Sequence, residues 1–321
     1  MSTLEQEPQE VDLRCVTVPG PVARLIQHRE VPLGGPRGII VTRTLPERTL
    51  PTIGAWCFID QSGPTIHRSR LLPHPHIGLQ TVTWLIEGEM LHRDTLGTEV
   101  LIRPGQLNLM TSGRGIAHSE FTPGDGQIPL HLFQLWVALP DRARHQAPHF
   151  EQHSELPELE GPGWTATVFM GALGGASSPA ATCTPLIGAE VRIVPGQTAR
   201  IPVDPRFEHG IVVGSGEVEI AGVRLERGPL LYLGTERTEL VIEAGAIGAT
   251  LILIGGEPLG EDLVMWWNFV ARTHEEIVEA RDDWEAHAER FGEIPYHRGA
   301  RMPAPPLPTV RLTPRRRPPE P

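Results

Sequence analysis

Short apolar runs separated by glycine and proline dominate the first half of this chain of 321 residues. The run 81–86 (Thr-Val-Thr-Trp-Leu-Ile) is β-branched and aromatic, and Glu87-Gly88-Glu89 follows it, a pattern that predicts a strand ending in a turn. Further short runs with glycine or proline beside them lie at 101–103, 107–109, 116–118 and 130–137. Repeated short strands and tight turns are typical of a small antiparallel β-barrel whose interior holds side chains.

The second half carries a faint repeat of the first. Glu87-Gly88-Glu89 is echoed by Ser215-Gly216-Glu217, and Arg103-Pro104-Gly105 by Arg227-Gly228-Pro229. We therefore expect an all-β protein with two consecutive jelly-roll-like barrels. The predicted units are an N-terminal barrel at 1–142, a polar, proline-containing linker at 143–163 and a C-terminal barrel at 164–257.

The period of the apolar pattern changes after Pro258. Thr273 and Glu276 form a capping box, and apolar residues then recur at helical spacing at Ile277, Ala280, Trp284, Ala288 and Phe291. The segment 258–292 is therefore predicted to contain an amphipathic helix that packs on a barrel. The remaining segment, 293–321, is rich in proline and arginine, with Arg315-Arg316-Arg317 near its end, and is expected to be a solvated tail.

Two pairs of polar residues in the first barrel carry candidate chemistry. In a strand, residues i and i+2 point to the same face, so His74 projects with His76, and His118 projects with Glu120. Two such pairs facing each other would form a pocket of three imidazoles and one carboxylate. These ligand types suit a divalent first-row metal and leave coordination positions open for substrate or oxygen, as in a catalytic site.

Composition narrows the classes of partner. The net charge of −11 disfavours direct, non-specific binding to nucleic acid, because a phosphate backbone needs a basic face. All 28 basic residues are arginine, which excludes lysine Schiff-base chemistry. The three cysteines are far apart, and we find neither a signal peptide nor an apolar run long enough to cross a membrane. These features favour a cytoplasmic protein.

Several motifs together resemble the pirin family of the cupin superfamily. They are His74-Pro-His76, the run 81–89, His92-Arg-Asp94, Arg103-Pro-Gly105, Met110-Thr-Ser-Gly-Arg-Gly-Ile-Ala-His-Ser-Glu120 and Leu135-Trp136. The resemblance extends over most of the chain and is weaker in the second half. It implies that both barrels are cupin barrels and that His74, His76, His118 and Glu120 hold one metal ion.

Three more polar residues are assigned around this site. Many cupins take a carboxylate ligand from the first motif, where this chain has Gln80, and an amide is a poor metal ligand. We expect Gln80 to support the ligands by hydrogen bonding instead. His92 and Asp94 share a strand face next to the ligands, and we interpret them as a polar cluster supporting the site, although a different metal pairing stays open.

The second barrel is expected to be degenerate. Aligning the glycine turns of the two halves places Pro202 and Asp204 opposite the first histidine pair, and Val241 and Glu243 opposite the second pair. This barrel therefore lacks the ligand set and would serve as a packing partner. His131, which alternates with apolar residues in the first barrel, is interpreted as a packing or supporting residue.

Three functions compete. The resemblance implies a metal-dependent quercetin 2,3-dioxygenase, with a flavonol-like aromatic substrate and with Glu120 as both ligand and general base. The alternative is a non-enzymatic regulator that senses metal or redox state and binds a protein partner. A cupin isomerase or storage protein fits the motifs least well. Fe²⁺ is the metal expected from the resemblance, while the ligand types also suit Mn, Ni, Co, Cu and Zn.

Overall fold

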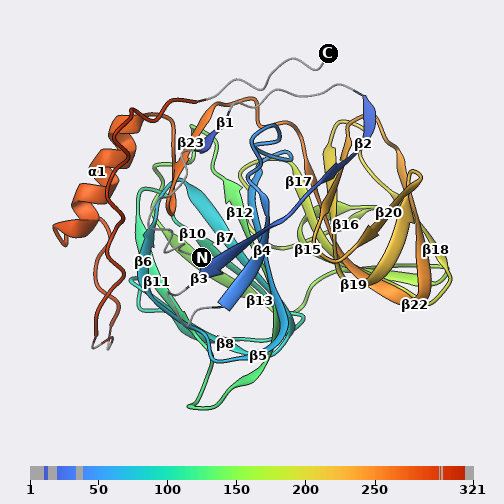
Figure 1. Cartoon of the computed structure of the whole chain (residues 1–321), viewed down its shortest axis with the longest axis horizontal. Coiled ribbons are helices and arrows are strands. Elements are labelled where there is room, and N and C mark those ends of the chain that lie inside the picture. The colour runs from blue at the N-terminus through green and yellow to red at the C-terminus, as the bar shows by residue number, and fades with distance from the viewer. Residues whose placement is uncertain (1–10, 14–19, 34–38, 296, 298, 315–321) are drawn as a thin grey trace.

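The computed structural model describes residues 11–13, 20–33, 39–295, 297 and 299–314, and within them it confirms an all-β protein built from two barrels. The barrels lie side by side, with one helix beside the first of them (Figure 1). The first barrel has a seven-stranded sheet, in the order β13 (His149–His153), β10 (Leu107–Thr111), β7 (Leu79–Glu87), β12 (Ile128–Ala138), β5 (Trp56–His67), β4 (Ile39–Leu45) and β3 (Arg29–Leu33). Its second sheet has the order β6 (Arg70–His76), β11 (Ile116–Phe121), β8 (Met90–Asp94) and β9 (Glu99–Ile102).

The second barrel is one ten-stranded antiparallel sheet. Its main path is β14 (Glu158–Gly161), β15 (Trp164–Leu173), β17 (Leu186–Ile193), β22 (Glu239–Gly256), β19 (Glu208–Ile220), β21 (Leu230–Gly234) and β2 (Pro21–Ile26). The short strands β16 (Ala176–Ser177), β18 (Thr198–Pro202) and β20 (Val223–Glu226) pair beside this path. A core of aliphatic side chains fills the barrel.

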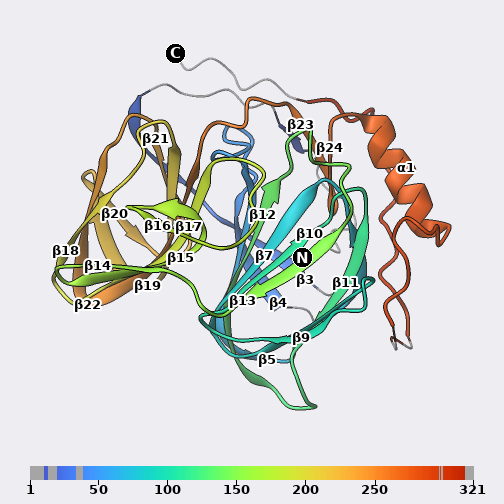
Figure 2. The same cartoon turned by 180° about the vertical axis from the view of Figure 1, so that it is seen from behind.

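The segment 143–163, predicted as a linker, contains strands of both barrels. β13 pairs with β10 at the edge of the first barrel, and β14 pairs with β15 in the second (Figure 2). An edge strand has one solvated side, so its polar composition resembles that of a loop. The predicted first unit, 1–142, also differs from the structure. It includes β2, which pairs with β21 and so belongs to the second barrel.

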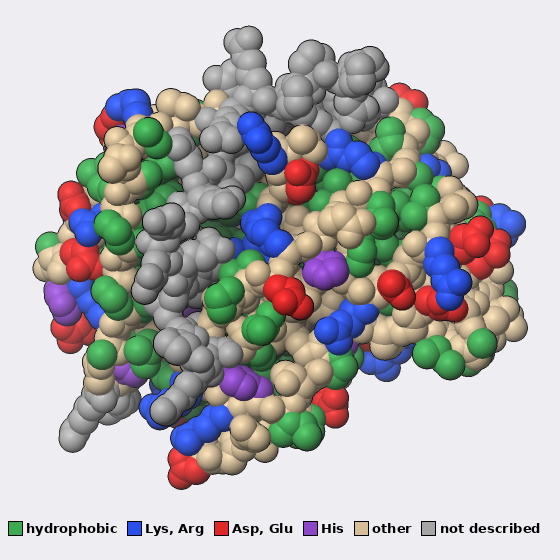
Figure 3. Space-filling view, viewed as in Figure 1, with side chains coloured by type: hydrophobic (Ala, Val, Ile, Leu, Met, Phe, Trp, Pro, Cys, Tyr) green, Lys and Arg blue, Asp and Glu red, His purple; other side chains and the backbone are tan. Residues whose placement is uncertain are grey.

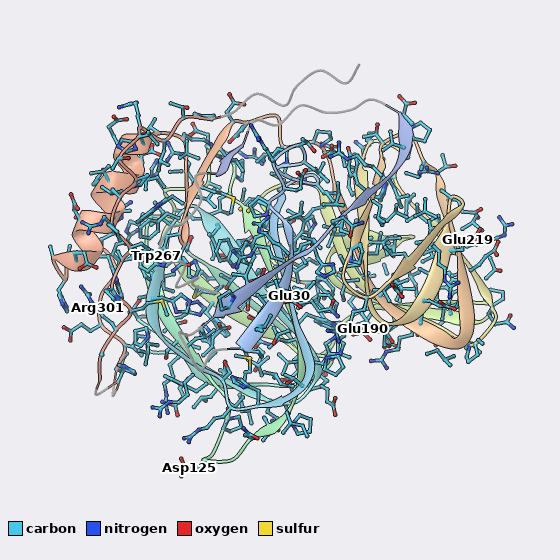
Figure 4. The ribbon with its side chains drawn as sticks, viewed as in Figure 1. Glu30, Asp125, Glu190, Glu219, Trp267 and Arg301 are labelled. Carbon is cyan, nitrogen blue, oxygen red and sulfur yellow. The ribbon has the colours of Figure 1, made fainter. Side chains whose placement is uncertain are left out.

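The outer faces of the two barrels form a shared core. Val82 and Trp84 on β7 pack in one cluster with Phe169 and Ile252 of the second barrel. Trp84 Nε1 donates a hydrogen bond to Glu190 Oε2 at 2.7 Å, and Figure 4 shows Glu190 between the barrels. The two backbones also touch, because a Cβ added at Gly54 would lie 2.6 Å from the Cα of Gly256. The barrels are therefore packed as tightly as a protein interior.

The helix α1 (His274–Glu285) begins as predicted, with Thr273 as its N-cap accepting a hydrogen bond from the Glu276 backbone. Its buried residues are Ile277, Ala280 and Trp284. The helix ends before Ala288 and Phe291, which the sequence placed on its apolar stripe. Phe291 is still buried, because the chain after the helix folds back onto the same cluster.

The tail was expected to be solvated, but its described part is packed. Met302 and Leu312 are buried in the cluster around the helix, and Trp284 Nε1 donates to the Met302 carbonyl at 2.8 Å. Figure 4 shows Arg301 beside the helix, where its guanidinium lies 4.0 Å from the Trp284 ring centroid. These contacts with the indole order a proline-rich segment. Arg315–Arg317 and Cys15 lie outside the described residues.

The C-terminal segment also forms a small sheet of β1 (Val11–Leu13), β23 (Leu263–Trp266) and β24 (Phe269–Ala271). The turn between β23 and β24 contains Trp267 at φ +54° and the fully buried Asn268. Figure 4 places Trp267 at the side of the first barrel. This turn brings a C-terminal backbone to the barrel that carries the candidate ligands.

In the view of Figure 3, arginine and acidic side chains are interspersed, without a continuous basic face. No helix among the described residues is long and apolar enough to cross a bilayer.

His209 makes stability depend on pH. This side chain is fully buried in the second barrel, and burial lowers its pKa from 6.5 to about 4. Between pH 6.5 and 4, His209 is protonated in the unfolded chain but not in the folded protein. Stability is therefore lost as pH falls from about 6.5 toward 4. Between pH 7.5 and 5, we expect the free energy of unfolding of His209→Leu to fall by about 2 kcal/mol less than that of the wild type.

Urea unfolding of both proteins at each pH measures this difference. The difference in free energy of unfolding between the two proteins at pH 7.5 gives the packing effect of the substitution. This difference is subtracted from the difference measured at pH 5. Equal losses of stability in the two proteins would contradict the assignment.

Candidate metal centre

The candidate ligands converge because β11 is an inner strand of the four-stranded sheet. His118 lies directly opposite His74 on β6 and Asp94 on β8, and Glu120 lies opposite His92. Residues directly opposite on neighbouring strands project from the same face. These five side chains and His76 are at most 2% exposed. The sheet thus directs six titratable groups into the barrel interior.

The three predicted histidines form one compact group. Their potential ligand atoms lie within 4.8 Å of one another, and His76 Nε2 is 3.1 Å from His118 Nε2. Burial lowers the pKa of His74 to about 3 and also lowers the pKa values of His76 and His118. All three imidazoles are therefore neutral near pH 7, the form in which histidine binds metal ions.

Backbone carbonyls set the orientation of two of these rings. His74 Nδ1 lies 2.8 Å from the Leu72 oxygen, and His76 Nδ1 lies 3.1 Å from the Asn268 oxygen. A carbonyl only accepts, so each Nδ1 carries the proton and each Nε2 keeps its lone pair. His74 Nε2 is buried without a partner. Asn268 belongs to the turn between β23 and β24, so the C-terminal segment takes part in the site.

Glu120 lies at one side of the histidine group. It belongs to a second compact group with His92 and His118, whose potential ligand atoms also lie within 4.8 Å of one another. Its Oε1 accepts a long hydrogen bond of 3.4 Å from Thr83 Oγ1, and its Oε2 is buried without a partner. A buried carboxylate is costly unless a cation or donors compensate it. The two groups share His118, and their donor types, imidazole and carboxylate, suit a divalent metal ion.

Gln80 does not support the ligands. Its Nε2 donates to Thr111 Oγ1 at 2.9 Å and to the Ala181 carbonyl at 3.1 Å. Thr83, which contacts Glu120, follows Gln80 by three positions on the same strand. Side chains an odd number of positions apart project from opposite faces, so Thr83 and Gln80 face opposite ways. Gln80 therefore faces the second half of the chain, and the role predicted for it was wrong.

His92 and Asp94 lie beside the candidate ligands, as the shared strand face predicted. His92 Nε2 is 3.2 Å from Asp94 Oδ2, and His92 Nδ1 is 3.4 Å from His118 Nδ1. Asp94 Oδ1 accepts hydrogen bonds from the backbone of Leu96 and Thr98, which fixes the carboxylate in the turn after β8. The three residues form one continuous chain of contacts.

Sequence reasoning missed three groups near the site. Thr83 Oγ1 also donates to Gln134 Oε1 at 3.1 Å, from the directly opposite position on the neighbouring strand β12. The alternation of polar and apolar residues in these strands was a usable signal, because it places Thr83 and Gln134 on an inner face. The carbonyl of Asn268 had no sequence signal, since every residue has one.

The second barrel has no comparable group. Both sets of three or more candidate ligands found among the described residues lie in the first barrel. Pro202, Asp204, Val241 and Glu243 thus form no such set. His131 also lies outside both sets, with its Nε2 3.0 Å from Gln61 Nε2, and burial lowers its pKa to about 4.

Comparisons with known proteins agree with this architecture. Residues 38–137 match the pirin family model, and residues 188–292 match the model of the pirin C-terminal cupin domain. A Pseudomonas aeruginosa protein named "Putative quercetin 2,3-dioxygenase PA1205" is 43% identical over 287 residues, which cover 88% of this chain and 90% of that protein. Human pirin is 33% identical over 64% of this chain and 73% of its own length.

A solved structure is also similar. The crystal structure of quercetin 2,3-dioxygenase from Acinetobacter baumannii has a TM-score of 0.85 and 42% identity, covering 90% of this chain and 96% of that one. With both domain models matched, this chain is a member of the pirin family of bicupin proteins.

Proposed function

We propose that this protein is a metal-dependent dioxygenase that acts on a flavonol-like substrate. One divalent ion, with Fe²⁺ as the favoured metal, is held by His74, His76, His118 and Glu120. The observation that carries the proposal is the buried, unpartnered Glu120 oxygen, which lies in one compact group with His118, while His118 is also grouped with His74 and His76. The names of the two similar proteins described above, "Putative quercetin 2,3-dioxygenase PA1205" and quercetin 2,3-dioxygenase, support the substrate class.

The protein's own residues would bind, orient and deprotonate the substrate. When bound, the metal ion supplies Lewis-acid polarisation of a substrate oxygen and brings the substrate together with O₂. Glu120 accepts the proton of the acidic flavonol hydroxyl, which makes the ring electron-rich toward O₂. Thr83 contacts Glu120 Oε1 and Oε2 has no partner, so Oε2 would bind the metal ion or, when detached from it, take the proton.

Burial of the ligands suits this role. Every candidate ligand is at most 1% exposed, so water competes poorly for the metal positions and for the deprotonated substrate. Carbonyl contacts at His74 and His76 hold both rings in the tautomer that binds a metal.

Loss of quercetin absorbance in air tests the proposal. The protein is freed of metal and reconstituted separately with Fe²⁺, Mn²⁺, Ni²⁺, Co²⁺ or Cu²⁺. We expect turnover with at least one ion, fastest with Fe²⁺, and none in Glu120→Ala. Tight binding of metal without turnover of any flavonol would contradict the dioxygenase assignment and favour the metal-dependent regulator that binds a protein partner.

A further inference from the structure

We infer that Asp94, His92 and Phe150 form a positioning assembly that fixes the tautomer of His118, and this inference rests on the proposed metal site. His74 and His76 each have a backbone carbonyl at Nδ1. His118 has a side chain there instead, because its Nδ1 faces His92 Nδ1 at 3.4 Å. The protonation of His92 at Nδ1 thus decides which nitrogen of His118 keeps its lone pair.

Two further contacts hold the orientation of His92. Asp94 Oδ2 lies 3.2 Å from its Nε2, and a carboxylate accepts, so this nitrogen carries a proton. The ring of Phe150 stacks on its face, with centroids 4.6 Å apart and planes at 26°. Phe150 lies on β13, which pairs with β10 at the edge of the barrel. His92 can therefore neither flip nor tilt without breaking one of these contacts.

This arrangement assigns the proton between the two histidines. Of the two facing Nδ1 atoms one must donate and the other accept, and since His92 Nε2 already donates to Asp94, we assign His92 Nδ1 as the acceptor and His118 Nδ1 as the donor. His118 Nε2 then keeps its lone pair, and it is the nitrogen that lies 3.1 Å from His76 Nε2. All three histidines consequently turn an Nε2 lone pair toward the same point.

Asp94→Asn tests this assignment with little other change. The asparagine Oδ1 can still accept from the Leu96 and Thr98 backbone, as Asp94 Oδ1 does. Its amide then donates toward His92 Nε2, which moves the His92 proton to Nδ1. Two donors would face each other unless His118 shifts its own proton to Nε2, the metal-binding atom. We expect metal affinity about 10- to 100-fold lower than in the wild type.

The measurement is proton NMR of the cobalt(II)-loaded protein in H₂O and D₂O. Exchangeable, paramagnetically shifted signals report the Nδ1 protons of ligating histidines, and the wild type should show three. Asp94→Asn should keep the signals of His74 and His76 and lose or shift that of His118. Asp125→Asn is the matched control, since Asp125 is exposed, pairs with Arg68 and lies in a protruding loop of the first barrel (Figure 4).

Two substitutions of His92 provide a second test. His92→Gln keeps a carbonyl oxygen that can accept from His118 Nδ1, whereas His92→Leu has similar size and no acceptor. We expect cobalt affinity to fall only a few-fold in His92→Gln and about 10- to 100-fold in His92→Leu. Circular dichroism melting verifies that both variants fold.

Three results would overturn the inference. Unchanged signals and affinity in Asp94→Asn would show that His92 does not set the tautomer of His118, while the ligand set would stand. Two cobalt ions per chain would mean that His92, His118 and Glu120 form a second metal site. A wild-type protein that binds no cobalt would refute the proposed ligand set and this inference together.

Discussion

Replacing His76 with alanine is expected to lower the bound metal from about one equivalent per chain to less than a tenth. The substitution removes one of three imidazoles whose ligand atoms lie within 4.8 Å of one another. Changes to residues that only support a ligand already weaken metal binding about 10- to 100-fold, so we expect more than about 100-fold for a ligand itself. Elemental analysis after dialysis, with calorimetric titration of the metal-free protein, measures both quantities.

His131→Ala is the matched control for this prediction. His131 is also a buried histidine of the first barrel, but it contacts Gln61 and lies outside both groups of candidate ligands. The His131→Ala substitution should lower the stability of the protein but leave its metal content near one equivalent. A His76→Ala protein that folds and keeps its full metal content would contradict the ligand assignment.

Replacing Glu120 with glutamine is expected to lower quercetin turnover by about 10²- to 10⁴-fold, the range that general-base catalysis contributes. Glutamine keeps the size of glutamate and can still accept from Thr83, but its amide cannot take the substrate proton. Three imidazoles remain, so we expect the metal content to fall less than in His76→Ala. Steady-state rates normalised to bound metal separate the two effects.

Thr83→Val is the companion variant for Glu120. It removes the 3.4 Å contact with Glu120 Oε1 and preserves the shape of the side chain. Because this contact is long and only orients the carboxylate, a loss of about tenfold or less is expected. If Glu120→Gln turned over as fast as the wild type, Glu120 would not be the base.

The ligand histidines could be predicted because their spacing is local. His74 with His76, and His118 with Glu120, are two residues apart on strands, and alternation alone places each pair on one face. The pairing of β6 with β11 then brings His74 opposite His118. The two-barrel architecture followed from short strands and repeated glycine turns for the same local reason.

Other parts of the site depend on register and distant backbone. Gln80 was assigned a supporting role beside the ligands by its position in a motif, but its neighbour Thr81 and not Gln80 shares the strand face of Thr83. β13 is polar because it lies at an edge, so Phe150 gave no signal of its contact with His92. The Asn268 carbonyl comes from a turn 192 residues beyond His76.

The shared core between the barrels restricts how this protein can change. Inside the second barrel, ligand positions could be lost without exposing the first barrel to water. Substitutions on its outer face are more restricted, because Phe169 and Ile252 pack against Trp84 and the backbones touch at Gly54 and Gly256. The second barrel, which holds neither set of candidate ligands found among the described residues, thus forms one wall of the first barrel, and truncations that remove it are expected to expose Val82 and Trp84 to water.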